Sequence, residues 1–187
     1  MLFNTLTNRR SFIKGSAAAF IAASVPTILT SGEAYASNGG AWRVSFKNAH
    51  TGDSYSGVYR VGDTYSPEAF QKISYVLRDF RTGEIFPMDP HVVDILAMSQ
   101  KKTIGPQQPM TILSGYRSPK TNSDLGKRSR GVAKNSFHMY GRAIDMHTEG
   151  YSTRGLRNVA LSLKAGGVGY YPRSNFVHID TGDVRTW

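Results

Sequence analysis

The segments SFHMYGRAID (residues 136–145) and FVHID (residues 176–180) decide how this chain folds. Each combines residues that favour β-strands with a loop at one end, and side chains in a strand alternate between its two faces. This alternation places Asp145 on one face of the first strand and His178 on one face of the second. His138 precedes the first strand in a predicted loop, which can fold back so that its imidazole approaches Asp145.

Two imidazoles and one carboxylate are a ligand set that catalytic zinc ions take, with a fourth position left for water. The chain contains 0 cysteines, which excludes a thiolate-rich structural zinc site and leaves His, Asp and Glu as possible ligands. The pattern predicts a metallohydrolase with His138, Asp145 and His178 as candidate ligands. His50 and His91 occur in turn and helix-start contexts and are interpreted as ordinary polar residues.

The N-terminal segment has the features of an export signal. Arg9 and Arg10 precede an apolar run from Ala17 to Leu29, which is shorter than the roughly 20 residues that a membrane-spanning helix needs. The run is followed by Ala34–Ala36, a small-x-small cleavage site. The paired arginines, with the residues behind them, resemble the twin-arginine type of signal. We therefore expect a twin-arginine-type signal peptide in residues 1–36, and an uncut membrane anchor is the alternative.

Cleavage after Ala36 would leave residues 37–187, a length typical of a single domain. The formal net charge of the whole chain is +10. A basic surface fits an anionic partner such as nucleic acid, lipid headgroups or a carboxylate-rich wall polymer. Export argues against nucleic acid, so we expect a protein of the periplasm, associated with the cell wall, that keeps no stable membrane span after cleavage.

Hydrophobic periodicity predicts an α+β fold, with a small antiparallel sheet that carries the metal ligands and helices packed on one side. Ser66-Pro67 and Asp89-Pro90 are helix starts, because each combines a capping side chain with proline in the first turn. The expected helices are 66–81, 90–103 and 152–165. The expected strands are a hairpin of 42–47 and 55–59, single strands at 110–113 and 141–146, and a second hairpin of 168–171 and 175–179.

The segment that follows the strand at 110–113 brings functional side chains to its exposed end. Glycine and proline break the strand there and leave Tyr116 and Arg117 at its mouth. Residues 126–134 then contain four basic side chains and almost nothing apolar. This segment is interpreted as a solvated surface loop, with contact to an acidic substrate as the alternative.

Longer motifs carry a resemblance to a known family. The pattern Ser-x-His-x-x-Gly-x-Ala-x-Asp at 136–145, a downstream histidine and the upstream SGYR at 114–117 resemble the zinc D-Ala-D-Ala peptidase family, which is grouped with lysostaphin-type and hedgehog-type folds. The segment GGVGYYPRSNFVHIDTG (166–182) is similar to murein endopeptidases of the MepK (YcbK) type. The similarity extends over nearly all of residues 37–187, which the resemblance implies form a single zinc peptidase domain.

The resemblance also implies roles for individual residues. Zinc would be bound by His138, Asp145 and His178, and Arg117 would contact the substrate or the developing oxyanion. Many members of the wider family carry a Glu or His general base shortly before the last ligand, whereas SNFV precedes His178 here. Strand alternation leaves two candidates for the base, namely His147, two residues beyond Asp145, and Asp180, two beyond His178. Each could instead orient a metal ligand.

These features predict a zinc-dependent murein endopeptidase that hydrolyses cross-links between peptidoglycan stem peptides. The alternatives are a non-catalytic peptidoglycan-binding or metal-binding exported module, a DD- or LD-carboxypeptidase of the same fold, and a zinc hydrolase of another small exported peptide. Two observations distinguish these possibilities: whether cross-linked sacculi release new peptides when incubated with the protein, and whether a chelator stops that release.

Overall fold

The computed structural model describes residues 40–129 and 131–187. The predicted signal peptide at 1–36 lies outside the described residues. Within the described part of the chain, no helix has both the length and the apolar character needed to cross a bilayer.

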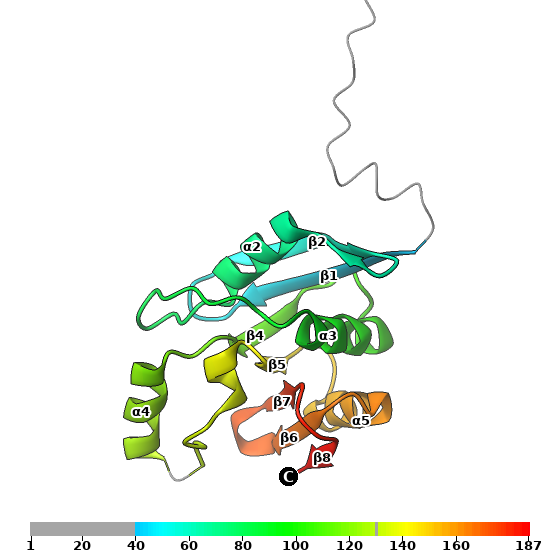
Figure 1. Cartoon of the computed structure of the whole chain (residues 1–187). Coiled ribbons are helices and arrows are strands. Elements are labelled where there is room, and N and C mark those ends of the chain that lie inside the picture. The colour runs from blue at the N-terminus through cyan, green and yellow to red at the C-terminus, as the bar shows by residue number, and fades with distance from the viewer. Residues whose placement is uncertain (1–39, 130) are drawn as a thin grey trace, which may run out of the picture.

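In the part of the chain that the structure describes, eight strands form one mixed sheet in the order β3-β2-β1-β4-β5-β7-β6-β8, with helices beside it (Figure 1). Most neighbouring strands are antiparallel, but β1 pairs with β4 and β6 pairs with β8 in parallel. The strands are β1 (Ala41–Asn48), β2 (Ser54–Val61), β3 (Thr64–Tyr65), β4 (Met110–Ser114), β5 (Ala143–His147), β6 (Gly167–Tyr171), β7 (Phe176–Asp180) and β8 (Arg185–Thr186).

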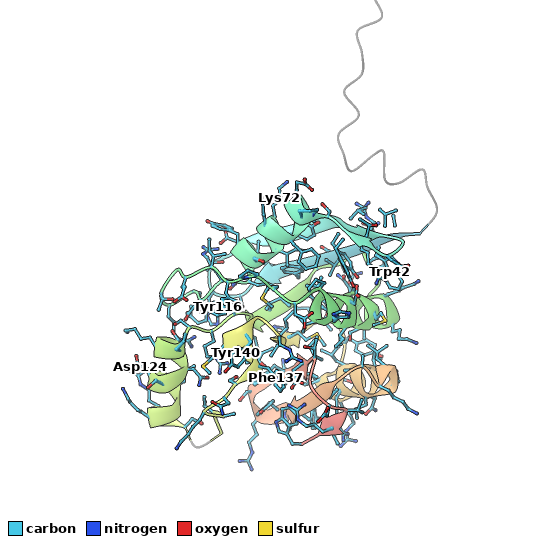
Figure 2. All side chains as sticks on the ribbon, in the orientation of Figure 1. Trp42, Lys72, Tyr116, Asp124, Phe137 and Tyr140 are labelled. Carbon is cyan, nitrogen blue, oxygen red and sulfur yellow. The ribbon has the colours of Figure 1, made fainter. Side chains whose placement is uncertain are left out.

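Four α-helices and two 3-10 helices complete the described fold: α2 (Pro67–Val76), α3 (Pro90–Thr103), α4 (Pro119–Arg128), α5 (Thr153–Leu163), η1 (Phe137–Tyr140) and η2 (Pro172–Ser174). Each α-helix begins after a residue whose side-chain oxygen accepts a backbone N–H of the first turn; these residues are Ser66, Asp89, Ser118 and Ser152. Figure 2 shows Lys72 of α2 at the top of the molecule, Asp124 of α4 at its lower left, and Phe137 of η1 below the centre of the view.

The two faces of the β5–β7 pair have different surroundings. Ile144 and Met146 of β5, with Val177 and Ile179 of β7, are fully buried in the hydrophobic core. Helix α3 contacts β5 and β7 on this side, and α5 contacts β6 and β7. Alternation therefore directs the residues between them, including Asp145, to the opposite face. The predicted α+β class is confirmed.

Several expected boundaries were wrong. Helix α2 ends at Val76 rather than at residue 81, because the carboxylate of Asp79 accepts the N–H of Arg81 and holds the chain in a turn. Helix α4 was not expected, and it takes in the start of the segment 126–134 that was interpreted as a loop. His138 lies in the 3-10 helix η1 rather than in an irregular loop. The sheet is also larger than predicted and contains parallel pairs.

Candidate metal centre

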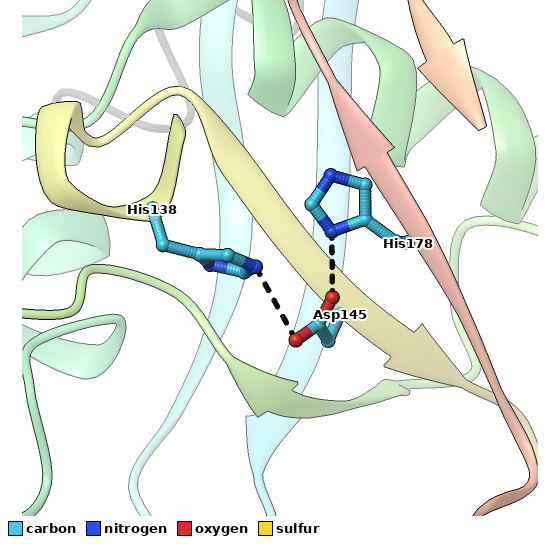
Figure 3. A group of neighbouring side chains, drawn as sticks. All are labelled: His138, Asp145 and His178. Carbon is cyan, nitrogen blue, oxygen red and sulfur yellow. Dashed lines mark hydrogen bonds and ion pairs between the residues drawn. The ribbon is translucent and has the colours of Figure 1, made fainter. Parts of the chain in front are cut away.

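His138, Asp145 and His178 converge on one point, with the carboxylate of Asp145 between the two imidazoles (Figure 3). The Asp145 Oδ1 atom is 2.8 Å from His178 Nδ1, and Oδ2 is 3.3 Å from His138 Nε2. One donor atom from each residue lies within 4.8 Å of the other two. Asp145 and His178 are directly paired in the register of β5 and β7, so the sheet fixes the position of these two residues relative to each other.

The position of His138 depends on the short helix η1. Ser136 caps the start of η1, and Gly141 ends it in the left-handed region, with φ of 64°. A side chain at position 141 is also excluded by space, because its Cβ would lie 2.3 Å from the carbonyl oxygen of Pro87. The ring of His138 is held from behind, since its Nδ1 lies 2.7 Å from the carbonyl oxygen of Gly115. This contact turns Nε2 toward Asp145.

His178 is held in the same way from its far side. Its Nε2 lies 3.0 Å from Oδ2 of Asp180, a fully buried carboxylate. Burial by itself would lower the pKa of His178, but the hydrogen bonds and charges of Asp145 and Asp180 outweigh it and raise that pKa to about 9. The raised pKa favours the protonated ring, and a metal ion bound at Nδ1 would displace that proton.

The two carboxylates stay ionised for the same reason. Burial would raise the pKa of Asp145, but the charges and hydrogen bonds of His138 and His178 hold it far below its ordinary value. Burial would also raise the pKa of Asp180, but hydrogen bonds from His178, Arg185 and the N–H of Gly182 outweigh it and lower that pKa. The centre therefore keeps two carboxylate charges next to two imidazoles, an arrangement that suits a divalent cation.

The residues present fit a divalent metal ion of the zinc type. The donor set is two imidazole nitrogens and one carboxylate, which is the composition of many catalytic zinc sites. The ring nitrogens that face away from the centre each have an acceptor, the carbonyl oxygen of Gly115 or the carboxylate of Asp180. Such partners fix the tautomer and ring direction of metal-binding histidines.

The centre opens into a cavity of about 430 Å³. Arg117 and Arg185 contribute basic groups to its lining, and aromatic side chains form much of the remaining wall: Phe137, Tyr171, Phe176 and Trp187. Trp187 packs beside His178, with the two ring centroids 5.3 Å apart, and donates its indole N–H to the hydroxyl of Tyr171 at 2.8 Å.

Comparison with known proteins identifies the family. The model of the family described as peptidoglycan L,D-endopeptidase MepK matches residues 36–187. The chain is 46% identical over 144 residues to the peptidoglycan L,D-endopeptidase MepK of Escherichia coli strain K12, covering 77% of this chain and 79% of that protein. The chain belongs to the MepK family. A probable MepK of Haemophilus influenzae is 41% identical over 144 residues, with 77% of each chain covered.

The MepK-type resemblance predicted from residues 166–182 is confirmed, and with it the assignment of the chain as a peptidase. In this MepK-family chain the guanidinium of Arg117 lies beside the centre, with its NH2 atom 3.6 Å from Asp145 Oδ2. Burial lowers the pKa of Arg117, and its Nε is a buried donor without a hydrogen-bond partner among the described residues.

The two candidate bases are in different positions. Asp180 lines the cavity, and its carboxylate is already hydrogen-bonded to His178, Arg185 and the N–H of Gly182. His147 is opposite Thr111 on β4 and does not line the cavity. Its Nδ1 is buried without a hydrogen-bond partner in the described part of the chain.

Sequence reasoning missed several residues that build this MepK-family site. Gly115 was interpreted only as a strand breaker, although its carbonyl holds His138. Asp79 anchors the loop of Arg117 by accepting from the N–H and hydroxyl of Ser118. Arg185 of β8 and Trp187, the residue that follows this strand, both line the cavity, and their i, i+2 spacing was the one signal in the sequence.

Proposed function

We propose that this chain is a zinc-dependent peptidoglycan L,D-endopeptidase that hydrolyses peptide cross-links in the bacterial cell wall. The convergence of His138, Asp145 and His178 at a cavity, in a member of the MepK family, carries the proposal. These three residues would hold the metal through His138 Nε2, a carboxylate oxygen of Asp145 and His178 Nδ1. The relatives are named for L,D-endopeptidase activity on peptidoglycan, and the proposal extends that activity to this chain.

Zinc would supply Lewis-acid chemistry, polarising the scissile carbonyl and activating water. The residues of the chain would position the substrate around it. Arg117 presents a planar set of N–H donors next to Asp145, which suits either the developing oxyanion or a carboxylate of the stem peptide. The aromatic wall would pack against the peptide and limit access of bulk water.

The hydrogen bonds of the two candidate bases favour different roles. Both oxygens of Asp180 already accept hydrogen bonds, and its pKa is held far below neutral, so it is a poor acceptor for another proton. We assign Asp180 to the orientation of His178. His147 has a ring nitrogen without a hydrogen-bond partner among the described residues but lies outside the cavity lining, so its candidacy as the base is left to the kinetic test.

The proposed reaction is tested on intact cross-linked sacculi. The full chain is incubated with sacculi alone, with a chelator, and with chelator followed by added zinc, and the released peptides are identified by mass spectrometry. We expect new cross-link cleavage products that disappear with the chelator, return with zinc, and are absent with His138→Ala. Release that is unaffected by the chelator would refute the metal assignment, and removal of terminal residues alone would assign a carboxypeptidase.

The roles of Arg117 and His147 need kinetic tests with measured zinc content. Arg117→Ala should lower kcat by about 100-fold or more while zinc content stays close to that of the wild type, since removal of one oxyanion donor typically has this effect. Loss of zinc instead would make Arg117 a structural support. His147→Gln should remove one limb of the pH profile of kcat/KM, with Asp180→Asn as the comparison; an unchanged profile would exclude His147 as the base.

We also propose that the protein is exported to the periplasm by residues 1–36 acting as a twin-arginine-type signal, and that residues 37–187 form the mature domain. The start of the family match at residue 36 and the cell-wall substrate of the relatives support this. The test is export of a folded reporter fused to residues 1–36, which should stop when Arg9 and Arg10 are both replaced by lysine. Export that continues would overturn the twin-arginine assignment.

A further inference from the structure

We propose that Arg185, on strand β8, is a positioning residue of the metal centre that acts through Asp180 on the ligand His178. This inference rests on the proposed function, because it assumes that His178 binds a metal. It adds a residue from a strand that contributes none of the three ligands.

A continuous line of hydrogen bonds joins Arg185 to the centre. Arg185 NH1 and NH2 lie 2.9 and 2.7 Å from the two oxygens of Asp180, which is a bidentate ion pair. Asp180 Oδ2 is 3.0 Å from His178 Nε2, and His178 Nδ1 is 2.8 Å from Asp145. The planar guanidinium therefore fixes the plane of the Asp180 carboxylate, and the carboxylate fixes the ring of His178.

Arg185 is itself held on several sides, although 40% of its side chain is exposed. Its guanidinium carbon lies 5.4 Å from the ring centroid of Phe137 and 4.9 Å from that of Trp187, both at cation–π distance. In the parallel register of β6 and β8, Arg185 pairs with Gly167, and a Cβ at position 167 would lie 2.3 Å from Arg185 NH1. The absence of a side chain there lets the guanidinium lie against the sheet and reach Asp180.

The arrangement differs from an ordinary surface ion pair because of what lies behind it. Asp180 is fully buried, so removal of Arg185 leaves a buried carboxylate with His178 and backbone N–H groups as its remaining donors. A carboxylate that loses this two-pronged contact is free to rotate out of its plane, and it then holds His178 Nε2–H less well. The imidazole then spends less time with Nδ1 directed at the metal position, which weakens metal binding and lowers turnover.

The test measures zinc affinity as well as activity. The full chain is stripped of metal, and the dissociation constant for zinc is measured by competition with a chromophoric chelator for the wild type, Arg185→Ala, Arg185→Lys and Arg173→Ala. Arg173, an exposed residue of η2 in the hairpin that joins β6 and β7, is the matched control for loss of one positive charge. Thermal unfolding of each metal-free protein shows whether it is folded, and kcat and KM are determined separately with saturating zinc.

We expect Arg185→Ala to weaken zinc binding by about 10- to 100-fold, the range seen when an outer partner of a metal ligand is removed. Its kcat should fall more than its KM rises. Arg185→Lys, which keeps the charge without the two-pronged contact, should lie between Ala and wild type, and it supplies the test if Arg185→Ala does not fold. Arg173→Ala should match the wild type.

Equal zinc affinity and kcat in wild type and both Arg185 variants would overturn the inference, and so would an equal loss in Arg173→Ala. The wild type provides the separate check on the proposed function. If it binds no zinc, the metal assignment fails; if it binds zinc and cleaves sacculi while Arg185→Ala does so equally well, only the role of Arg185 fails.

Discussion

Asp79 gives a quantitative prediction that links stability to the active-site loop. This carboxylate is 1% exposed. It accepts hydrogen bonds from the N–H and hydroxyl of Ser118 at 2.9 and 2.7 Å, and from the N–H of Arg81 at 2.9 Å. Burial would raise the pKa of Asp79, but hydrogen bonds from Thr121, Ser118 and Arg81 outweigh it and lower the pKa from 3.8 to about 2.

The lowered pKa sets the size and sign of the effect. A shift from 3.8 to about 2 corresponds to about 2.5 kcal/mol of stability, at 1.36 kcal/mol for each pKa unit. Because the folded-state pKa of Asp79 is depressed, this contribution is fully present above the unfolded-state pKa and is lost as pH falls through the folded-state value. It should be about 1.3 kcal/mol near pH 3 and below about 0.5 kcal/mol at pH 2.

The perturbation is Asp79→Asn, which keeps the shape but removes the charge and turns one acceptor into a donor facing Ser118. Urea unfolding of the metal-free wild type and variant, followed by circular dichroism from pH 7 to pH 2, gives the difference in unfolding free energy at each pH. We expect about 2.5 kcal/mol near neutral pH, shrinking toward zero at pH 2. Comparison within each pH cancels the titration of the other carboxylates.

A difference that stays constant with pH would refute the reasoning, because it would mean that the ionised form of Asp79 is not the stabilising one. A functional effect should accompany the loss of stability. Ser118 follows Arg117 and caps α4, so loosening Ser118 should displace Arg117 and lower kcat even under conditions where the variant remains folded. Unchanged kcat would show that the loop holds its shape without Asp79.

Three further predictions concern the site and the core. Gly169→Ala would place a Cβ 2.8 to 2.9 Å from three atoms of the Trp187 indole, so it should shift the fluorescence of Trp187 and raise KM severalfold while the melting temperature changes little; unaltered fluorescence would contradict the close approach. Ile144→Ala, at a fully buried position on the core face of β5, should cost about 2 to 5 kcal/mol in urea unfolding, and a cost below 1 kcal/mol would contradict the packing. Zinc at about 100 times its dissociation constant should add about 2.7 kcal/mol of stability to the wild type and none to His138→Ala, as measured by calorimetry.

The sequence predicted the parts of the fold that depend on local signals. Asp89-Pro90 marked the start of α3, and alternation along β5 and β7 separated candidate ligands from core residues correctly. Helix α4 carries the same capping signal at Ser118-Pro119 but almost no apolar residues, so hydrophobic periodicity could not reveal it. The end of α2 was extended too far because Leu77 continues the helical apolar pattern, whereas in the fold it is buried at the helix C-cap, where the turn begins.

The remaining parts depend on contacts between segments distant in sequence. The parallel pairing of β6 with β8 brings Arg185 to Asp180 and Trp187 to His178, and neither residue belongs to a recognisable motif. The support of His138 by the Gly115 carbonyl is a backbone contact, which side-chain identity does not encode. Sequence patterns could therefore name the candidate ligands and Asp180 as a possible orienting group, but not the Gly115 carbonyl or Arg185.

The hairpin between β6 and β7 determines which face of β7 carries the candidate ligand His178. Asn175 closes it in a left-handed conformation, with φ of 52°, immediately before β7. One extra residue in this turn would exchange the two sides of β7, burying an imidazole among aliphatic groups and turning Val177 and Ile179 toward the cavity. Two extra residues would leave His178 on the face that it occupies now. Viable length variants of this loop in laboratory selections should consequently differ from the parent by even numbers.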